Sequence, residues 1–251
     1  MTEGLHLAHA PIVEAVIDIN CDLPPGTDFS ELQERAKQDL SGSYPKARRL
    51  ITQRRELGIA VVERVQPVSQ RVTGLQFLTE DEKQIVQFRG EGYSFNRLAP
   101  YGRLDDYFAD IEWSWNIFRT LTTPVQIRAI GLRFINRILL PMVDGRVELK
   151  QYLRVSPQLP DEETLMFVGF LNQHAAVEVA TGNHVNITLV MESLEEDKLP
   201  IILDIETSDV RMRPAEQWDG IREAILSLRR LKNRVFERTL TETCLNLFRQ
   251  P

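Results

Sequence analysis

Apolar and polar residues alternate along a long stretch at the middle of the chain, residues 126–141. The stretch is rich in Ile and Leu and ends at a proline, a pattern that predicts one long β-strand. Arg133 and Arg137 fall on one face of this strand, and Asn136 falls on the other. The face shared with Asn136 also carries the apolar residues Ile130, Leu132 and Phe134. Because arginine and asparagine inside a sheet need polar partners or a cavity, this strand is the most informative part of the sequence.

Periodicity divides the rest of the chain into strands and helices. Alternating or β-branched runs predict strands at residues 11–20, 57–65, 71–78, 84–89, 165–180, 184–193 and 201–207. Residues 93–96 are predicted to prolong the strand at 84–89 past a bulge at Gly90 or Gly92. Apolar residues at helical spacing predict helices at 28–40, 104–121 and 214–236, a short helical piece at 149–153 and a last short helix ending at 248.

Element order is similar in the two parts of the chain, residues 1–124 and 125–251. Each part reads strand, helix, three strands, helix, with the central strand opening the second part. The parts share no obvious residue identity, so a duplication rests on element order alone, and an ordinary α+β chain would give a similar order. We predict an α+β fold with antiparallel sheet and helices packed on one side, in which two halves pack as one unit.

Composition narrows the class of protein. The chain has 251 residues, 43% of them hydrophobic and 26% charged, which is typical of a folded globular protein and excludes a mainly disordered one. The formal charge of −6 argues against a general nucleic-acid coat but leaves a local basic patch open. Two scattered cysteines, no apolar run of transmembrane length and no export signal favour a cytoplasmic protein with no membrane association.

Three carboxylates are the candidates for a metal site. Asp204 and Glu206 lie two apart on one strand, hence on one face, and Glu192 lies on the preceding strand. Such a cluster can bind a divalent cation. The alternative is an ordinary half-exposed strand, because apolar residues are interleaved with the carboxylates and no lysine or histidine follows at the spacing of a nuclease.

Other signatures of catalysis are missing from the sequence. It contains no glycine-rich phosphate loop, no serine in a nucleophile elbow and no cysteine near a histidine in sequence. We therefore expect no cofactor and no catalytic residues, which favours a non-enzymatic protein and leaves an enzyme as the remaining alternative.

Two runs of basic residues offer a second kind of surface. One run contains Arg48, Arg49, Arg54 and Arg55 after the first helix, and the other lies on the last helix and contains Arg229, Arg230, Lys232, Arg234 and Arg238. Either run could contact nucleic acid, although basic residues near helix ends are more often a solvated face.

Several stretches resemble a sporadically distributed bacterial protein family of unassigned function. The resemblance lies in His9–Val16 (His-Ala-Pro-Ile-Val-Glu-Ala-Val), in Gly131–Ile138 (Gly-Leu-Arg-Phe-Ile-Asn-Arg-Ile) with Pro141, and in the closing stretch from Arg230 through Phe236–Thr241. The segment Leu228-Arg229-Arg230 departs from the family, which has a histidine before the Phe-Glu pair. The resemblance implies patchy occurrence, as for genes of mobile elements, defence systems or toxin–antitoxin-like loci, and it implies no catalytic residues.

These observations lead to two functional hypotheses. The first is a binding or accessory protein that acts through a protein partner, because Trp, Tyr, Phe and Arg dominate interfaces. The second is a nucleotide or small-ligand sensor with a cleft between the halves lined by Arg133, Asn136 and Arg137. The sequence leaves the oligomeric state open.

Overall fold

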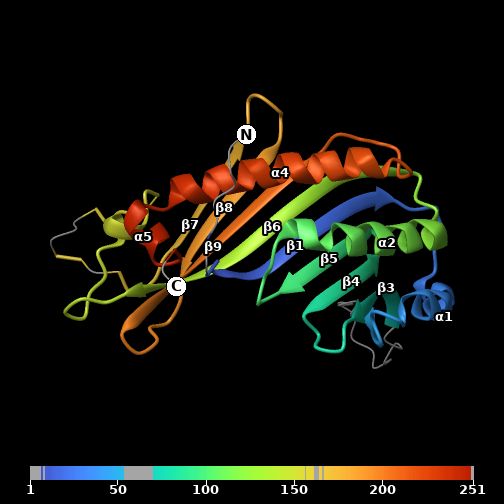
Figure 1. Ribbon diagram of the computed structural model, residues 1–251, viewed down its shortest axis with the longest axis horizontal. Helices are drawn as coiled ribbons and strands as arrows, with labels where there is room; N and C mark the ends of the chain where they lie inside the picture. The colour runs from blue at the N-terminus through green and yellow to red at the C-terminus, as the bar shows by residue number, and fades with distance from the viewer. Residues whose placement is uncertain are drawn as a thin grey trace, which may run out of the picture.

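The computed structural model describes residues 7, 9–53, 70–155, 157–160, 164–165 and 167–249, and these residues form one antiparallel sheet with helices against it (Figure 1). The strands are β1 (Ile12–Asp22), β2 (Lys46–Gln53), β3 (Gln70–Leu78), β4 (Gln84–Arg89), β5 (Gly92–Leu98), β6 (Gln126–Pro141), β7 (Leu171–Val177), β8 (His184–Met191) and β9 (Lys198–Asp209). The helices are α1 (Phe29–Leu40), α2 (Leu104–Thr122), α3 (Leu149–Tyr152), α4 (Trp218–Thr239) and α5 (Glu242–Asn246). The α+β class predicted from the sequence is confirmed.

The order of the strands is nearly symmetric about the pair β1 and β6. Across the sheet the order is β2-β3-β4-β5-β1-β6-β9-β8-β7, and all neighbours are antiparallel. In each half of the chain the first strand lies at the centre and the last strand pairs beside it. Ala15 of β1 lies opposite Phe134 of β6, so one sheet continues across the boundary between residues 1–124 and 125–251. We call the β1–β6 pair the seam.

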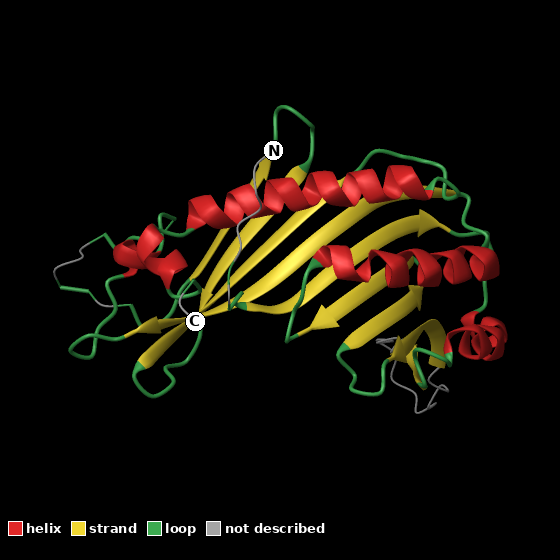
Figure 2. Ribbon diagram, in the orientation of Figure 1, coloured by secondary structure: helices red, strands yellow, loops and turns green. Residues whose placement is uncertain are grey.

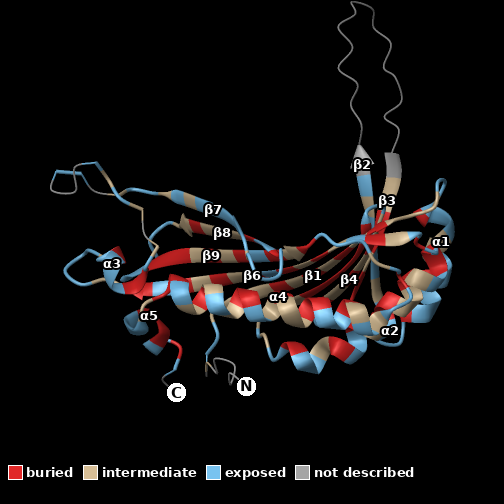
Figure 3. Cartoon of the chain, turned by 90° about the horizontal axis from the view of Figure 1, so that it is seen from above, coloured by how far each residue is buried: buried red, intermediate tan, exposed pale blue. Residues whose placement is uncertain are grey.

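The helices cover one face of the sheet. Figure 2 shows α2 and α4 crossing the strands on the same face, and Figure 3, turned by 90°, shows both helices along one side of the sheet. This one-sided packing explains the alternation along β6. Ile130, Leu132 and Phe134 are buried beneath the helices, whereas Arg133 is exposed on the open face. The main core joins residues of both halves, so the hydrophobic contact is shared across the seam.

The strand β2 was not predicted. Lys46–Gln53 carries Lys46, Arg48 and Arg49, and these charges obscure the alternation that marks a strand. They are compatible with a strand at the sheet edge, where charged side chains reach water. The predicted strand at residues 57–65 lies outside the described residues.

The hairpin of β4 and β5 replaces the predicted bulge. The segment Gly90-Glu91-Gly92 reverses the chain, and β5 pairs antiparallel with β4 as a separate strand. Gly92 has φ +139°, and a Cβ atom there would lie 2.1 Å from the carbonyl oxygen of Ile19. The turn therefore packs directly on β1, which requires glycine. Sequence periodicity does not distinguish a tight turn between two strands from a bulge within one.

The remaining helices and strands follow the sequence with shifted ends. β7 starts at Leu171, later than the predicted 165, and α4 starts at Trp218, after a loop that follows Pro214. Thr241 caps α5, with its Oγ1 atom accepting a hydrogen bond from the backbone N–H of Cys244. Among the described residues, no helix is long and apolar enough to cross a membrane.

A cavity at the seam as the candidate functional site

The central arginines pair with carboxylates on the open face of the sheet. The guanidinium of Arg133 donates two hydrogen bonds to the carboxylate of Asp204, with Nε–Oδ1 at 2.9 Å and Nη2–Oδ2 at 2.6 Å. Arg137 Nε donates to Glu192 Oε2 at 2.7 Å, and Arg137 also pairs with Glu195. The hydrogen bonds to these carboxylates raise the pKa of both arginine side chains. The arginines are therefore held by partners within the fold.

The same contacts account for the carboxylates considered for a metal site. Asp204 faces Arg133, Glu192 faces Arg137, and Glu206 accepts a hydrogen bond from Asn186 Nδ2 at 3.4 Å. Within the described residues, no three His, Cys, Asp or Glu side chains gather closely enough to hold a metal ion. These carboxylates have arginine or asparagine side chains of the fold as partners, so a metal site is not supported.

The basic run after α1 lies on the edge strand β2. Arg48 forms an ion pair with Glu82 at 2.7 Å, and Arg49 Nε donates to Gln33 Oε1 at 2.5 Å. Arg54 and Arg55 lie outside the described residues. The arrangement is that of an edge strand with locally paired charges, and it adds no support for a nucleic-acid surface.

Asn136 lies on the face opposite to Arg133 and Arg137. It is 2% exposed, and its Nδ2 atom donates to the carbonyl oxygen of Leu203 at 2.9 Å. The prediction of a single cleft lined by Arg133, Asn136 and Arg137 is therefore wrong. Residues one apart on a strand point to opposite faces, and Asn136 points toward the helices. There it lines a cavity of about 390 Å³.

The cavity lies where the two halves meet beneath the helices. Its walls come from four segments that are far apart in the sequence: the chain entering β1, the loop leading into α2, the strand β6, and the last part of α4. The lining residues are Leu7, Ala10, Pro11, Ile12, Tyr101, Gly102, Arg103, Leu104, Phe134, Asn136, Arg229, Lys232, Asn233 and Phe236. Three of these are cationic and none is acidic, in a chain whose formal charge is −6.

Lys232 is the central polar group of the cavity. The residue is only 9% exposed, and its Nζ atom lies 3.9 Å from the centroid of the Phe134 ring. None of the described residues accepts a hydrogen bond from Nζ or forms an ion pair with it. Burial, together with the nearby charge of Arg229, lowers the pKa of Lys232 to about 7, and Glu237 acts in the opposite direction.

The position of Lys232 corrects its assignment to a solvated basic face. The buried stripe of α4 contains Ile221, Ile225, Leu228 and Phe236. Lys232 lies four residues after Leu228 and four before Phe236, so it occupies a core position of the helix. The sequence did contain a signal for this position, because Lys232 has the helical spacing of the apolar stripe. The signal was missed because Lys232 was grouped with the basic residues next to it.

Tyr101 contributes a second polar group without a partner. Its ring packs edge-on against Phe134 with centroids 5.4 Å apart, and its Oη atom is buried without a hydrogen-bond partner among the described residues. Burial raises the pKa of the Tyr101 phenol, so the hydroxyl keeps its proton and can act as a donor. Phe134 thus contacts both Lys232 and Tyr101.

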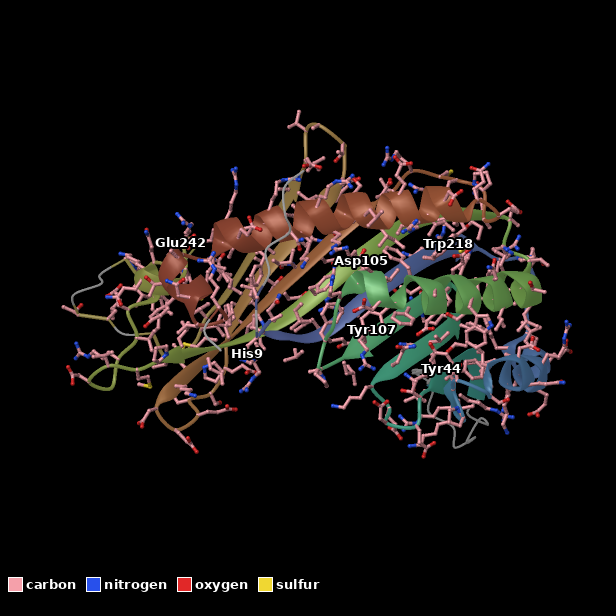
Figure 4. The ribbon with its side chains drawn as sticks, in the orientation of Figure 1. His9, Tyr44, Asp105, Tyr107, Trp218 and Glu242 are labelled. Atoms are coloured by element: carbon pink, nitrogen blue, oxygen red, sulfur yellow. The ribbon has the colours of Figure 1, made fainter. Side chains whose placement is uncertain are left out.

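The arginines of the cavity lie nearer its rim. Arg229 Nη1 donates to both carboxylate oxygens of Asp105, at 2.9 and 3.0 Å, which joins α4 to the first turn of α2. Figure 4 labels Asp105 where the start of α2 approaches α4. The side chain of Arg103 is 77% exposed and lies 3.7 Å from the same carboxylate. The carboxylate of Asp105 therefore faces two arginines of the cavity lining.

The chain was compared with protein families, curated proteins and solved structures. No family profile, no curated protein and no solved structure matches it.

Proposed function

We propose that this chain is a non-enzymatic receptor for a small anionic ligand, bound in the cavity at the seam. The observation that carries the proposal is Lys232, a buried amine without a counterion in the wall of a cavity that has no acidic lining residue. A buried charge normally has a partner, because desolvation of an unpaired ion is strongly unfavourable. An anionic ligand would supply the partner that the fold lacks.

The walls of the cavity indicate the general chemistry of the ligand. A volume of about 390 Å³ falls in the range of small-molecule sites. Apolar surface comes from Phe134, Phe236 and Leu104, whereas the cations come from Lys232 and the two arginines. A ligand with an apolar or aromatic body and one carboxylate or phosphate group is complementary to both.

The site also suits a sensor, since its walls belong to segments from both halves of the chain. A ligand that contacts α4, β6 and the loop before α2 would stabilise their present arrangement relative to others. The resemblance to a sporadically distributed bacterial family leads us to propose an accessory role in a mobile-element, defence or toxin–antitoxin-like locus. The neighbouring genes test that part of the proposal independently of the ligand.

Thermal unfolding in the presence of ligands tests the receptor proposal. The panel should contain aromatic and aliphatic carboxylates, nucleotides and cyclic nucleotides at millimolar concentration. Binding to the native state alone stabilises by about 2.7 kcal/mol at a ligand concentration roughly 100 times Kd, so a true ligand raises Tm in a concentration-dependent way.

A matched pair of variants makes this experiment specific. Lys232→Met removes the buried amine and is expected to abolish the ligand-dependent rise in Tm. Arg230→Met removes an exposed cation two residues away on the same helix, outside the cavity lining, and should leave the rise intact. No stabilisation by any anion in the panel, or equal stabilisation of Lys232→Met and wild type, would contradict the receptor proposal.

The strand β7 supports a second candidate function, binding to a protein partner. It forms the edge of the sheet, and its sequence Leu-Asn-Gln-His-Ala-Ala-Val contains no Asp, Glu, Lys or Arg. Leu171 and Val177 at its ends are exposed. Edge strands usually carry charges or prolines that prevent pairing with other chains, as β2 does at the other edge with three cations. The unprotected edge favours strand pairing.

We propose a second copy of the chain as the partner at this edge. Antiparallel pairing of two β7 strands about a twofold axis at His174 would place Leu171 of one copy opposite Val177 of the other. No Asp, Glu, Lys or Arg side chain would oppose another in this register, because the strand contains none of these residues.

Light scattering coupled to gel filtration tests self-pairing. We expect a dimer for the wild type, and a monomer for His174→Lys, which would place two ammonium groups opposite each other. Val179→Lys adds the same charge outside the strand and should remain dimeric. A wild-type monomer at high concentration would contradict this second candidate and leave the receptor proposal unaffected.

A further inference from the structure

The cavity separates two kinds of cationic group. Lys232 lies at the inner wall against Phe134, whereas Arg103 and Arg229 lie toward the rim, near Asp105. A ligand whose anionic group pairs with the rim arginines would place its adjacent atoms toward Lys232. The reactivity of the buried Lys232 amine indicates which functional group of the ligand would lie there.

The surroundings of Lys232 favour an uncharged amine. The residue is buried and no carboxylate lines the cavity to hold it as ammonium, and the ring of Phe134 offsets only part of the desolvation of the cation. The titratable groups that act on it are Arg229 and Glu237, of which Arg229 disfavours the charged form and Glu237 favours it. With a pKa of about 7, a large fraction of Lys232 carries a free lone pair at neutral pH, whereas an ordinary lysine with a pKa near 10.5 is almost entirely protonated. Desolvated lysines of this kind act as nucleophiles toward carbonyl groups.

We propose that Lys232 captures a carbonyl-bearing acid, such as a 2-oxo acid with an apolar side chain, as a reversible imine. This inference rests on the receptor function proposed above and specifies the ligand class of the same cavity. The carboxylate would pair with Arg229 or Arg103 at the rim, and the carbonyl carbon would face Nζ. The apolar side chain would contact Phe134 and Phe236.

The bond changes balance without any redox partner. The Nζ lone pair forms a C–N bond to the carbonyl carbon, the C=O π bond breaks, and in net one Nζ proton passes to the carbonyl oxygen, which gives a carbinolamine. Loss of that hydroxyl together with the remaining Nζ proton releases one water molecule and leaves the imine. Tyr101, whose Oη atom is buried without a partner among the described residues, can donate a hydrogen bond to the carbonyl oxygen during the addition.

Reductive trapping on the full chain tests the inference. The protein is incubated at neutral pH with phenylpyruvate and sodium cyanoborohydride, and the modified lysines are identified by intact mass and peptide mapping. We expect an adduct at Lys232 that forms at least about tenfold faster than any adduct at the exposed Lys37, because the pKa of Lys232 is lowered to about 7. Lys232→Arg keeps the positive charge but should lose the adduct.

A second ligand separates the imine from simple anion binding. Phenyllactate has the same carboxylate and ring but a hydroxyl in place of the carbonyl, so it should raise Tm and slow the labelling of Lys232 without forming an adduct. If both acids raise Tm and Lys232 is not trapped, the imine is overturned and the receptor function stands. If neither acid binds and labelling is equal at Lys37 and Lys232, the imine is overturned, and the receptor function is then decided by the wider ligand panel.

Discussion

The Nζ atom of Lys232 on α4 lies 3.9 Å from the centroid of the Phe134 ring on β6. This contact joins the last long helix to the central strand, and it forms the inner wall of the cavity. A cation over an aromatic face is stabilised by the ring quadrupole, which offsets part of the desolvation of the ammonium. The pair therefore links the stability of the seam to the chemistry of the candidate site.

Truncation of Phe134 should destabilise the protein strongly. Phe134 is buried among residues of both halves, so Phe134→Ala removes packing from the seam itself. We expect a loss of about 3–5 kcal/mol in the free energy of unfolding. Leu139→Ala on the same strand is the control, since that side chain is exposed and should change stability by about 0.5 kcal/mol or less. Denaturant melts measure both, and an unchanged midpoint for Phe134→Ala would contradict the shared core.

Lys232 should give the protein a distinctive alkaline pH dependence. Below about pH 7 the lysine is protonated in both the folded and the unfolded chain. Between about 7 and its ordinary value of 10.5 only the unfolded chain binds the proton, so raising the pH stabilises the fold, by up to about 1.4 kcal/mol per pH unit.

Comparison with Lys232→Met isolates this effect from all other titrations. The unfolding free energy of wild type minus that of Lys232→Met should increase from pH 7 to pH 10 and should be constant below pH 6. Urea melts at a series of pH values measure it. A difference that is independent of pH would show that Lys232 titrates normally.

Arg133 and Asp204 should contribute modestly to stability. The Arg133 side chain is 46% exposed and that of Asp204 is 17% exposed, so water screens their bidentate pair. We expect Arg133→Ala to lose about 1 kcal/mol, and a double-mutant cycle with Asp204→Ala to give a coupling of roughly 0.5–1 kcal/mol that falls at high salt. A loss of about 3–5 kcal/mol would instead indicate a buried ion pair.

Asp209 should make the loop before α4 sensitive to acid. Its carboxylate is buried and accepts hydrogen bonds from Arg211 and Arg213, with both Nη2–Oδ2 distances at 2.6 Å. Burial alone would raise the pKa of Asp209, but these arginines hold it well below its ordinary value of 3.8. The stabilisation is therefore present above about pH 4 and is lost as the pH falls further.

The substitution Asp209→Asn tests this role. We expect a loss of about 1–3 kcal/mol at pH 7, because two guanidinium groups lose a charged acceptor. The loss should shrink as the pH falls below 3.8, where wild type also begins to lose the contribution. Thermal melts of both proteins from pH 7 to pH 3 measure the difference, and a constant difference would contradict the role.

Local patterns in the sequence determined much of the fold. The alternation in residues 126–141 placed Ile130, Leu132 and Phe134 on the buried face and Arg133 on the other, and β6 has this arrangement. The spacing of aromatic residues in 104–121 predicted α2 almost to its ends. Such patterns suffice because each strand or helix must bury its own apolar side, whichever neighbours it packs against.

The tertiary structure alone decided the candidate site. Lys232 and Tyr101 are more than 100 residues apart in the sequence, and they meet at Phe134 only because α4 folds back over the seam. The sequence likewise named Arg133 and Asp204 but did not reveal that they pair with each other. Side-chain partners across a sheet depend on strand order and register, and a cavity depends on the places where packed segments fail to fill space. Both are properties of long-range contacts, which local periodicity does not determine.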